Sequence, residues 1–127
     1  MRFGLLFGVI DKGIVMGHIV KLSADAFSNF VREGDAIVLF SASWCRPCDE
    51  MKPVFQALAD ELSAQAMFGV IDSAVSPTVA VTMGVRSVPS IALFRDGRLR
   101  LLLSGPRTFA ATREAILDAL QAGAWSR

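Results

Sequence analysis

The sequence predicts an α/β fold with a central mixed β-sheet of about four to five strands and helices on both faces of the sheet. Short apolar runs typical of buried strands alternate with segments whose apolar residues recur at helical spacing. The last two strand-like runs instead flank an Asp-Gly pair at 96–97, which favours a hairpin. Parallel pairing early in the chain should therefore be followed by an antiparallel pair near its end.

The composition fits one globular domain, because 53% of the 127 residues are hydrophobic and 20% are charged. The formal net charge is only +1 and the basic residues are scattered, so no long-range field attracts nucleic acid or anionic lipid. No apolar run approaches the roughly 20 residues that a membrane-spanning helix needs. We expect no nucleic-acid or membrane partner, and any selectivity should be local.

The chain is predicted to begin with an amino-terminal arm or extra strand over 1–17, ahead of a domain over 18–127. The apolar runs 3–10 and 14–22 are separated by Asp-Lys-Gly at 11–13, a plausible turn. A hairpin is one interpretation, but the first run is equally compatible with a helix or a loose arm.

The first residues also have the charge and apolar run of a secretory leader. However, Asp11 and Lys12 follow directly, and no A-x-A-like cleavage site is present. We therefore expect a cytoplasmic protein. Cleavage of a leader near residue 17 would instead favour an oxidising compartment.

The first half of the domain is predicted to be strand, helix, strand and helix. Residues 19–22 form a strand, Ser23 caps a short helix that ends at Gly34, and 36–40 form a buried central strand. A longer helix follows from Arg46 to about Gln65. The apolar faces of the two helices comprise Phe27, Phe30 and Val31, and then Met51, Val54, Phe55, Leu58 and Leu62.

The second half begins with a buried strand over 67–72 and a helix that starts at Ser76-Pro77 and ends at Gly84. Two strands over 90–94 and 99–104 then form the hairpin.

A final helix is capped by Thr108 and ends before Gly123. Its apolar residues are Phe109, Ile116, Leu117 and Leu120. We interpret the arginines Arg95, Arg98 and Arg100 as the solvated side of the preceding hairpin.

The chain has two cysteines, Cys45 and Cys48, at the junction between the central strand and the long helix. The positive end of a helix dipole stabilises an anion, so a thiolate on Cys45 is favoured there. Cys45 can then attack a disulfide, and Cys48, one turn along, can resolve the mixed disulfide. A structural staple is a poor alternative, because the loop closed between the two cysteines is very short.

Inert core thiols or half of a zinc site are the remaining interpretations of this pair. A closed zinc site usually needs four ligands, and the chain has a single histidine, His18, and no second cysteine pair. We expect no metal and assign no role to His18.

Several separated features occur in a characteristic order: WCRPC at 44–48, Pro53, SVPS at 87–90 and Gly97. From about Ile19 to Ala122 the chain resembles the thioredoxin family, which implies a thioredoxin fold. The resemblance makes Pro89 a cis-proline facing the cysteines, and Val88 a backbone site for an extended substrate. We expect the substrate-binding residues to be Trp44, Arg46, Pro47, Val88, Pro89 and Gly105.

Three positions differ from the family pattern. Thioredoxins place a buried aspartate where this chain has Leu39 and a lysine where it has Phe68. Because such groups help to deprotonate the second cysteine, we expect either that water takes over this role or that Cys48 resolves more slowly. Arg46 replaces a glycine, and its charge beside the thiolate should make the reduction potential less negative.

Together these observations predict a thiol-disulfide oxidoreductase, a protein-disulfide reductase with Cys45 and Cys48 as catalytic residues and no cofactor. Its partners would be protein disulfides, with a reductase or a low-molecular-weight thiol as electron donor. Two alternatives remain: a thioredoxin-like scaffold module that docks a dedicated partner, and an oxidase or isomerase of an oxidising compartment. A homodimer through the amino-terminal arm is a further expectation.

Overall fold

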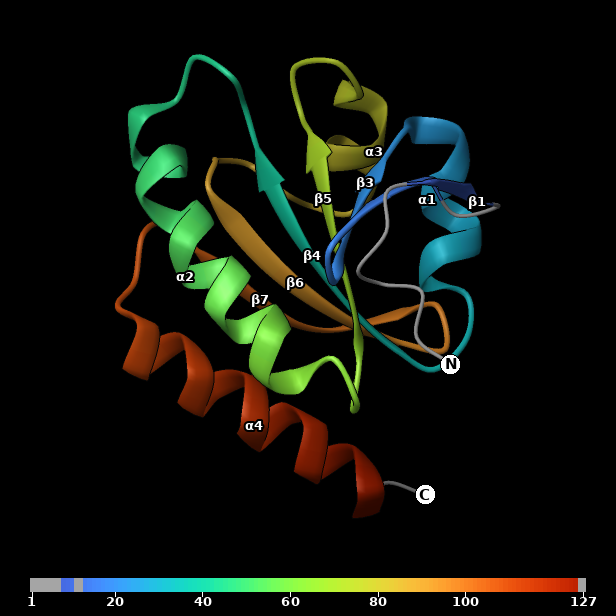
Figure 1. Ribbon diagram of the computed structural model, residues 1–127, viewed down its shortest axis with the longest axis vertical. Helices are drawn as coiled ribbons and strands as arrows, with labels where there is room; N and C mark the ends of the chain where they lie inside the picture. Colours follow the sequence, from blue (N-terminus) through green and yellow to red (C-terminus); the bar gives the residue numbers. More distant parts are fainter. Residues whose placement is uncertain (1–7, 11–12, 126–127) are drawn as a thin grey trace.

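The computed structural model describes residues 8–10 and 13–125, which form one sheet with helices on both of its faces (Figure 1). The strands are β1 Gly8–Ile10, β2 Gly13–Met16, β3 Ile19–Leu22, β4 Asp35–Ser41, β5 Met67–Asp72, β6 Ser90–Arg95 and β7 Arg98–Ser104. The helices are α1 Ala24–Val31, α2 Arg46–Leu62, α3 Pro77–Thr82 and α4 Phe109–Trp125. The described elements thus follow the predicted order from β3 onward.

The sheet has seven strands in the order β1-β2-β3-β5-β4-β6-β7. Its central strand β4 pairs parallel with β5 and antiparallel with β6, and β6 pairs antiparallel with β7. The predicted hairpin turn is present, with both Asp96 and Gly97 at positive φ. The mixed sheet of five strands, β3-β5-β4-β6-β7, confirms the predicted fold class.

Two hydrophobic clusters cover the two faces of the sheet. Alternate residues of β4 face opposite sides, with Val38 and Phe40 in one cluster and Ile37 and Leu39 in the other. Helices α1 and α3 cover the first cluster, and α2 and α4 cover the second (Figure 1). A strand buried on both faces needs a continuous apolar sequence, as β4 has.

The amino-terminal strands differ from the prediction. The apolar run 14–22 is not one strand, because the chain turns at Gly17, whose φ is 65°, and separates β2 from β3. Strands β1 and β2 form the hairpin and extend the sheet beyond the expected five strands. Residues 3–7 and the predicted turn at 11–12 lie outside the described residues.

The helix ends confirm some predicted caps and correct others. Ser23 caps α1 by accepting the Ala26 N–H at 3.2 Å, and Thr108 accepts the Ala111 N–H at 3.1 Å. Ser76, by contrast, makes no side-chain cap bond to α3. Helix α2 ends at Leu62 rather than near Gln65, and α4 continues through Gly123 to Trp125.

The assignment of Arg95 to a solvated hairpin face is wrong. Its guanidinium forms an ion pair with Asp35 at 2.6 Å and donates to the Leu120 carbonyl at 3.2 Å. The Asp35 carboxylate raises the pKa of Arg95 through this hydrogen bond. Arg95 therefore ties β4 and β6 to α4, whereas Arg98 and Arg100 are exposed as expected.

Candidate active site

Three loops meet at one end of the sheet because of the strand register. Phe40 near the end of β4 pairs with Ser90 at the start of β6, and Ser90 pairs with Ser104 at the end of β7. The loop after β4, the loop before β6 and the loop after β7 therefore lie at the same sheet end. The Gly105 N–H donates to the Pro89 carbonyl at 2.8 Å and joins the second loop to the third.

Cys45 is the N-cap residue of α2. Its φ of −97° and ψ of 112° are extended, and its Sγ accepts the Cys48 N–H at 3.2 Å. The sulfur thus occupies the place that a serine or threonine oxygen takes in ordinary caps. Pro47, within the first helical turn, has no N–H that would need a partner. The first turn of α2 therefore directs its positive end at the Cys45 sulfur.

The two cysteines are joined as a disulfide, with their Cα atoms 5.3 Å apart. Cys45 is 4% exposed and Cys48 is fully buried, so Cys45 is the cysteine that solvent reaches. Ala42 and Val88 pack against the pair, and the Val88 carbonyl oxygen lies 3.8 Å from Cys45 Sγ.

The loop before β6 places Val88 and Pro89 beside the cysteines, and the peptide bond between them is cis. Val88 forms no hydrogen bond to another backbone group in the described part of the chain. In the next loop, Gly105 has a φ of 84°, a conformation that favours glycine. The structure thus places the predicted site residues of the three loops together.

Trp44, Arg46 and Pro47 are also at this sheet end and are exposed, Trp44 at 73%. An exposed tryptophan beside a disulfide offers a large apolar surface that a partner can cover.

The residues that pack α2 against the sheet are apolar. Leu39 and Phe68 are each 1% exposed and belong to the cluster between the sheet and α2. Phe68 packs against Phe55 of α2 in an edge-to-face arrangement, with ring centroids 5.5 Å apart. No Asp, Glu, Lys, Arg or His is buried among the residues that the structure describes.

Sequence reasoning missed three residues around the site. Ala42 packs on the disulfide, and the Arg107 N–H lies 3.4 Å from Met51 Sδ, which ties the loop after β7 to α2. Ala42 is a small residue just before the cysteines, which is a weak sequence signal that it packs against them. The contact between Arg107 and Met51 had none, because it joins segments 56 residues apart.

The comparison with protein families decides the relationship. The Thioredoxin family model matches residues 18–119, which include both cysteines and the cis-proline. The chain belongs to the thioredoxin family. Curated thioredoxins from Chlamydia caviae and Chlamydia muridarum are 35% and 39% identical to it over 77 residues, which is 61% of this chain and 74% of each relative.

A solved structure gives the same result for the fold. A mutant thioredoxin from Halobacterium salinarum matches with a TM-score of 0.70 and 26% identity. The match covers 80% of this chain and 88% of that chain. The chain is therefore a thiol-disulfide oxidoreductase of the thioredoxin family, and it acts on protein disulfides.

Metal-ligand clusters and membrane-spanning helices are not found in the described part of this thioredoxin-family chain. Across residues 8–10 and 13–125, no three His, Cys, Asp or Glu residues are grouped so as to hold a metal ion. None of the helices in these ranges has the length and apolar character needed to cross a membrane.

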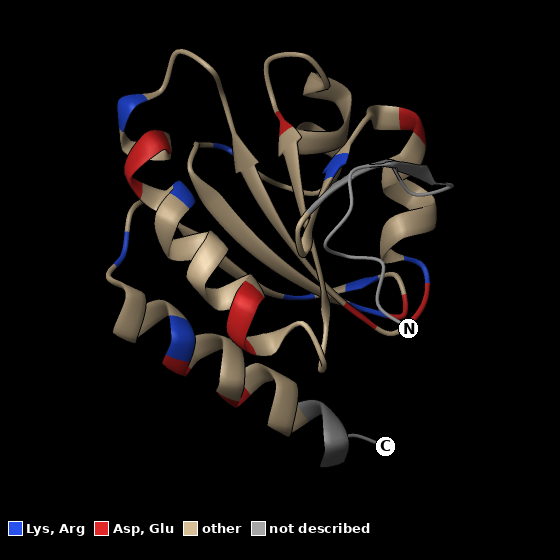
Figure 2. Ribbon diagram, viewed as in Figure 1, with Lys and Arg blue, Asp and Glu red and all other residues tan. Residues whose placement is uncertain are grey.

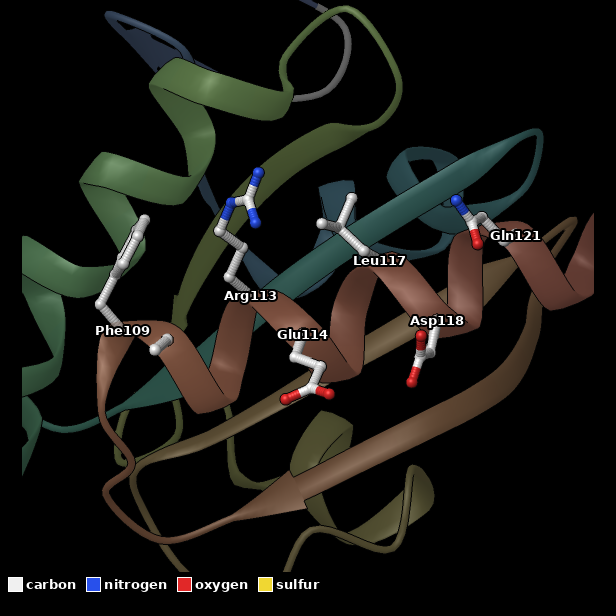
Figure 3. A pocket seen from close by; sticks show the side chains of 7 residues that line it. Phe109, Arg113, Glu114, Leu117, Asp118 and Gln121 are labelled. Atoms are coloured by element: carbon white, nitrogen blue, oxygen red, sulfur yellow. The ribbon is translucent and has the colours of Figure 1, made fainter.

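A hollow of about 660 Å³ lies along α4 and includes none of the predicted site residues. Figure 3 shows that Arg113 and Leu117 point toward α2, whereas Glu114 and Asp118 point to the other side of α4. Arg113 is held there by an ion pair with Glu61 at 2.6 Å. The hollow is therefore a shallow helix surface, and we assign no function to it.

Proposed function

We propose that Cys45 is the nucleophile and Cys48 the resolving thiol of this oxidoreductase. The observation that carries the proposal is the hydrogen bond from the Cys48 N–H to Cys45 Sγ at the start of α2. It supports a thiolate on Cys45, the cysteine with residual exposure, and leaves the buried Cys48 for an attack within the protein.

The exchange has two steps. In the dithiol state, the Cys45 thiolate attacks one sulfur of a substrate disulfide, forms a new S–S bond and releases the other substrate sulfur as a thiolate. The Cys48 thiolate then attacks Cys45 Sγ, restores the Cys45–Cys48 disulfide and releases the second substrate thiolate. Two electrons pass from the protein to the substrate.

The proposed substrate-binding residues surround Cys45. Trp44 and Pro47 supply apolar surface, Arg46 supplies charge, and Gly105 leaves room for substrate backbone. The N–H and C=O groups of Val88, next to Pro89, have no backbone partner among the described residues and suit pairing with an extended substrate segment, in the manner of an added strand.

Reduction of insulin disulfides with dithiothreitol as electron source tests the proposal. The enzyme accelerates reduction catalytically, at protein concentrations far below that of insulin. A scaffold module would instead form a stable complex with a partner and give no turnover.

The resolving step should depend on pH. Leu39 and Phe68 are apolar, and no charged side chain is buried among the described residues, so we expect no buried base to accept the Cys48 proton. Water or hydroxide must then take this proton, so the rate of resolution should rise with pH. Single-turnover decay of the mixed disulfide between pH 6 and 8 measures this. A rate that is flat over that range would contradict the absence of a base.

The reduction potential should be less negative than the approximately −270 mV of thioredoxin. Arg46 is exposed, so its attraction to the Cys45 thiolate contributes at most about 1 kcal/mol, or about 20 mV. A redox titration against glutathione measures the potential, and Arg46→Gly should lower it by up to this amount. A potential more negative than that of thioredoxin, unchanged in Arg46→Gly, would refute the role of Arg46.

The remaining proposals concern the context in which the protein acts. We propose a cytoplasmic protein that receives electrons from a reductase or a low-molecular-weight thiol, with residues 18–127 as the catalytic domain. A homodimer through the amino-terminal arm is supported by the position of β1 at the edge of the described sheet, where no other described strand pairs with its outer side. The mass of the full chain in solution, compared with that of a chain lacking residues 1–12, tests the dimer.

A further inference from the structure

We infer that the site prefers disulfides flanked by acidic residues, and that Arg46, Arg86 and Arg107 provide this preference. The inference rests on the proposed function, because it concerns the substrates of the same Cys45 site. Its basis is that the meeting of three loops gathers arginines that are far apart in the sequence.

Each of the three loops contributes one arginine near the disulfide. Arg46 follows Cys45 directly, Arg86 lies two residues before Val88, and Arg107 lies two residues after Gly105. The bonds already described hold these segments together, from Gly105 to Pro89 and from Arg107 to Met51. Figure 2 shows a blue segment at the start of α2, one in the loop before β6 and one in the connection before α4.

These three arginines are exposed, and in the described structure their side chains form no ion pair or hydrogen bond. Arg95 and Arg113 are different, because each is held by a carboxylate. Unpaired guanidinium groups remain available to a carboxylate on a partner, which they can bind in bidentate geometry.

The nearby carboxylates are partly occupied. Asp49 pairs with Lys52 at 3.5 Å, and the Asp72 carboxylate accepts the Ala74 and Val75 N–H groups at 2.8 and 3.3 Å. Glu50 is exposed and lies one helical turn from Arg46, so it offsets part of that charge.

The positive charge therefore concentrates on the β6 and β7 side of Cys45. Between α3 and β6, and between β7 and α4, Arg86 and Arg107 are the charged residues of their loops. The same side carries the Val88 backbone, where an extended substrate would pair. A peptide with Asp or Glu beside its cysteine brings those carboxylates toward Arg86 and Arg107.

Matched peptide disulfides test this inference. Three peptides of equal length carry Glu, Gln or Lys on both sides of the cysteine, and kcat/KM for their reduction is measured at about 20 mM and about 300 mM salt. We expect the Glu peptide to be preferred over the Lys peptide by about tenfold at low salt, since exposed pairs contribute a few-fold each. The preference should fall toward one at high salt.

Charge reversal at two arginines provides the decisive comparison. The double variant Arg86→Glu/Arg107→Glu should lose or invert the preference at low salt. Arg98→Glu/Arg100→Glu is the matched control, because it makes the same charge change on exposed residues of β7, outside the three loops. The control should keep the preference of the unmodified chain.

The outcomes separate this inference from the proposed function. Normal reduction of the Gln peptide with equal rates for Glu and Lys peptides overturns the acidic preference alone. An equal effect of both double variants would show that net charge is responsible, and this also overturns the acidic preference. A loss of rate that the double variant Arg86→Glu/Arg107→Glu shows only in exchange with glutathione disulfide, and not with the peptides, overturns the preference as well. No reduction of any peptide would instead refute the proposed roles of Cys45 and Cys48.

Discussion

The variant Cys45→Ser should reduce insulin disulfides at least about 10³-fold more slowly than the unmodified chain. A serine hydroxyl is not ionised near neutral pH and cannot form a disulfide with the substrate, so the first step of exchange is lost. The rate of insulin reduction at fixed dithiothreitol concentration measures the effect.

Cys48→Ser is the matched variant, because it removes the second sulfur and keeps the first. It should still attack substrate and should accumulate a mixed disulfide on Cys45, visible as an added substrate mass that dithiothreitol releases. Substantial turnover by Cys45→Ser, or an adduct on Cys48 in Cys45→Ser with none on Cys45 in Cys48→Ser, would show that the two roles have been assigned in the wrong order.

The variant Phe30→Ala should lower the free energy of unfolding by about 3–5 kcal/mol. Phe30 is fully buried between α1 and the sheet, and its ring covers Gly69 of β5. A Cβ built on Gly69 would lie 2.9 Å from the ring, so the contact is closely packed and truncation leaves a cavity.

Phe109→Ala is the control for this prediction, because Phe109 is 37% exposed at the start of α4. It should cost less than about 1 kcal/mol. Urea unfolding of both variants gives the comparison, with the midpoint and the slope fitted separately. If both variants lost similar stability, Phe30 would not have the packing role described here.

The central part of the fold was predictable from local sequence. Strand β4 is buried on both faces, so its composition alone identifies it, and the Asp-Gly pair at 96–97 determines the hairpin between β6 and β7. Both signals depend on neighbouring residues in the chain. They can therefore be recognised without knowledge of the tertiary structure.

Predictions failed where several conformations suit the same local sequence. A glycine can make a turn, as Gly17 does, or continue a helix, as Gly123 does, and packing decides between them. Phe109 is one of the apolar residues of the final helix, yet it is exposed at the start of α4, whereas Ile116 is fully buried. Spacing identifies a helix face but does not say how far along the helix that face stays covered.

The predictability of the site divides in the same way. Cys45, Cys48 and Pro89 belong to short motifs and were found from the sequence, together with the residues beside them. That the loops carrying Arg86 and Arg107 lie at the same sheet end as the disulfide depends on the register of β4, β6 and β7. No local pattern contains that information.

The hydrogen bond from the Gly105 N–H to the Pro89 carbonyl limits which backbone groups beside the disulfide are available to a substrate. Pro89 has no N–H and its carbonyl already accepts one hydrogen bond, so the backbone of Val88 is the part of this loop that we propose pairs with an extended substrate. Pairing with the backbone of one residue does not depend on the side chains of the substrate, so substrates of many different sequences can bind in this way. Differences in rate between substrates must then come from the side chains around Cys45. Changing those side chains would change which substrates are preferred and would leave the sulfur chemistry unaltered.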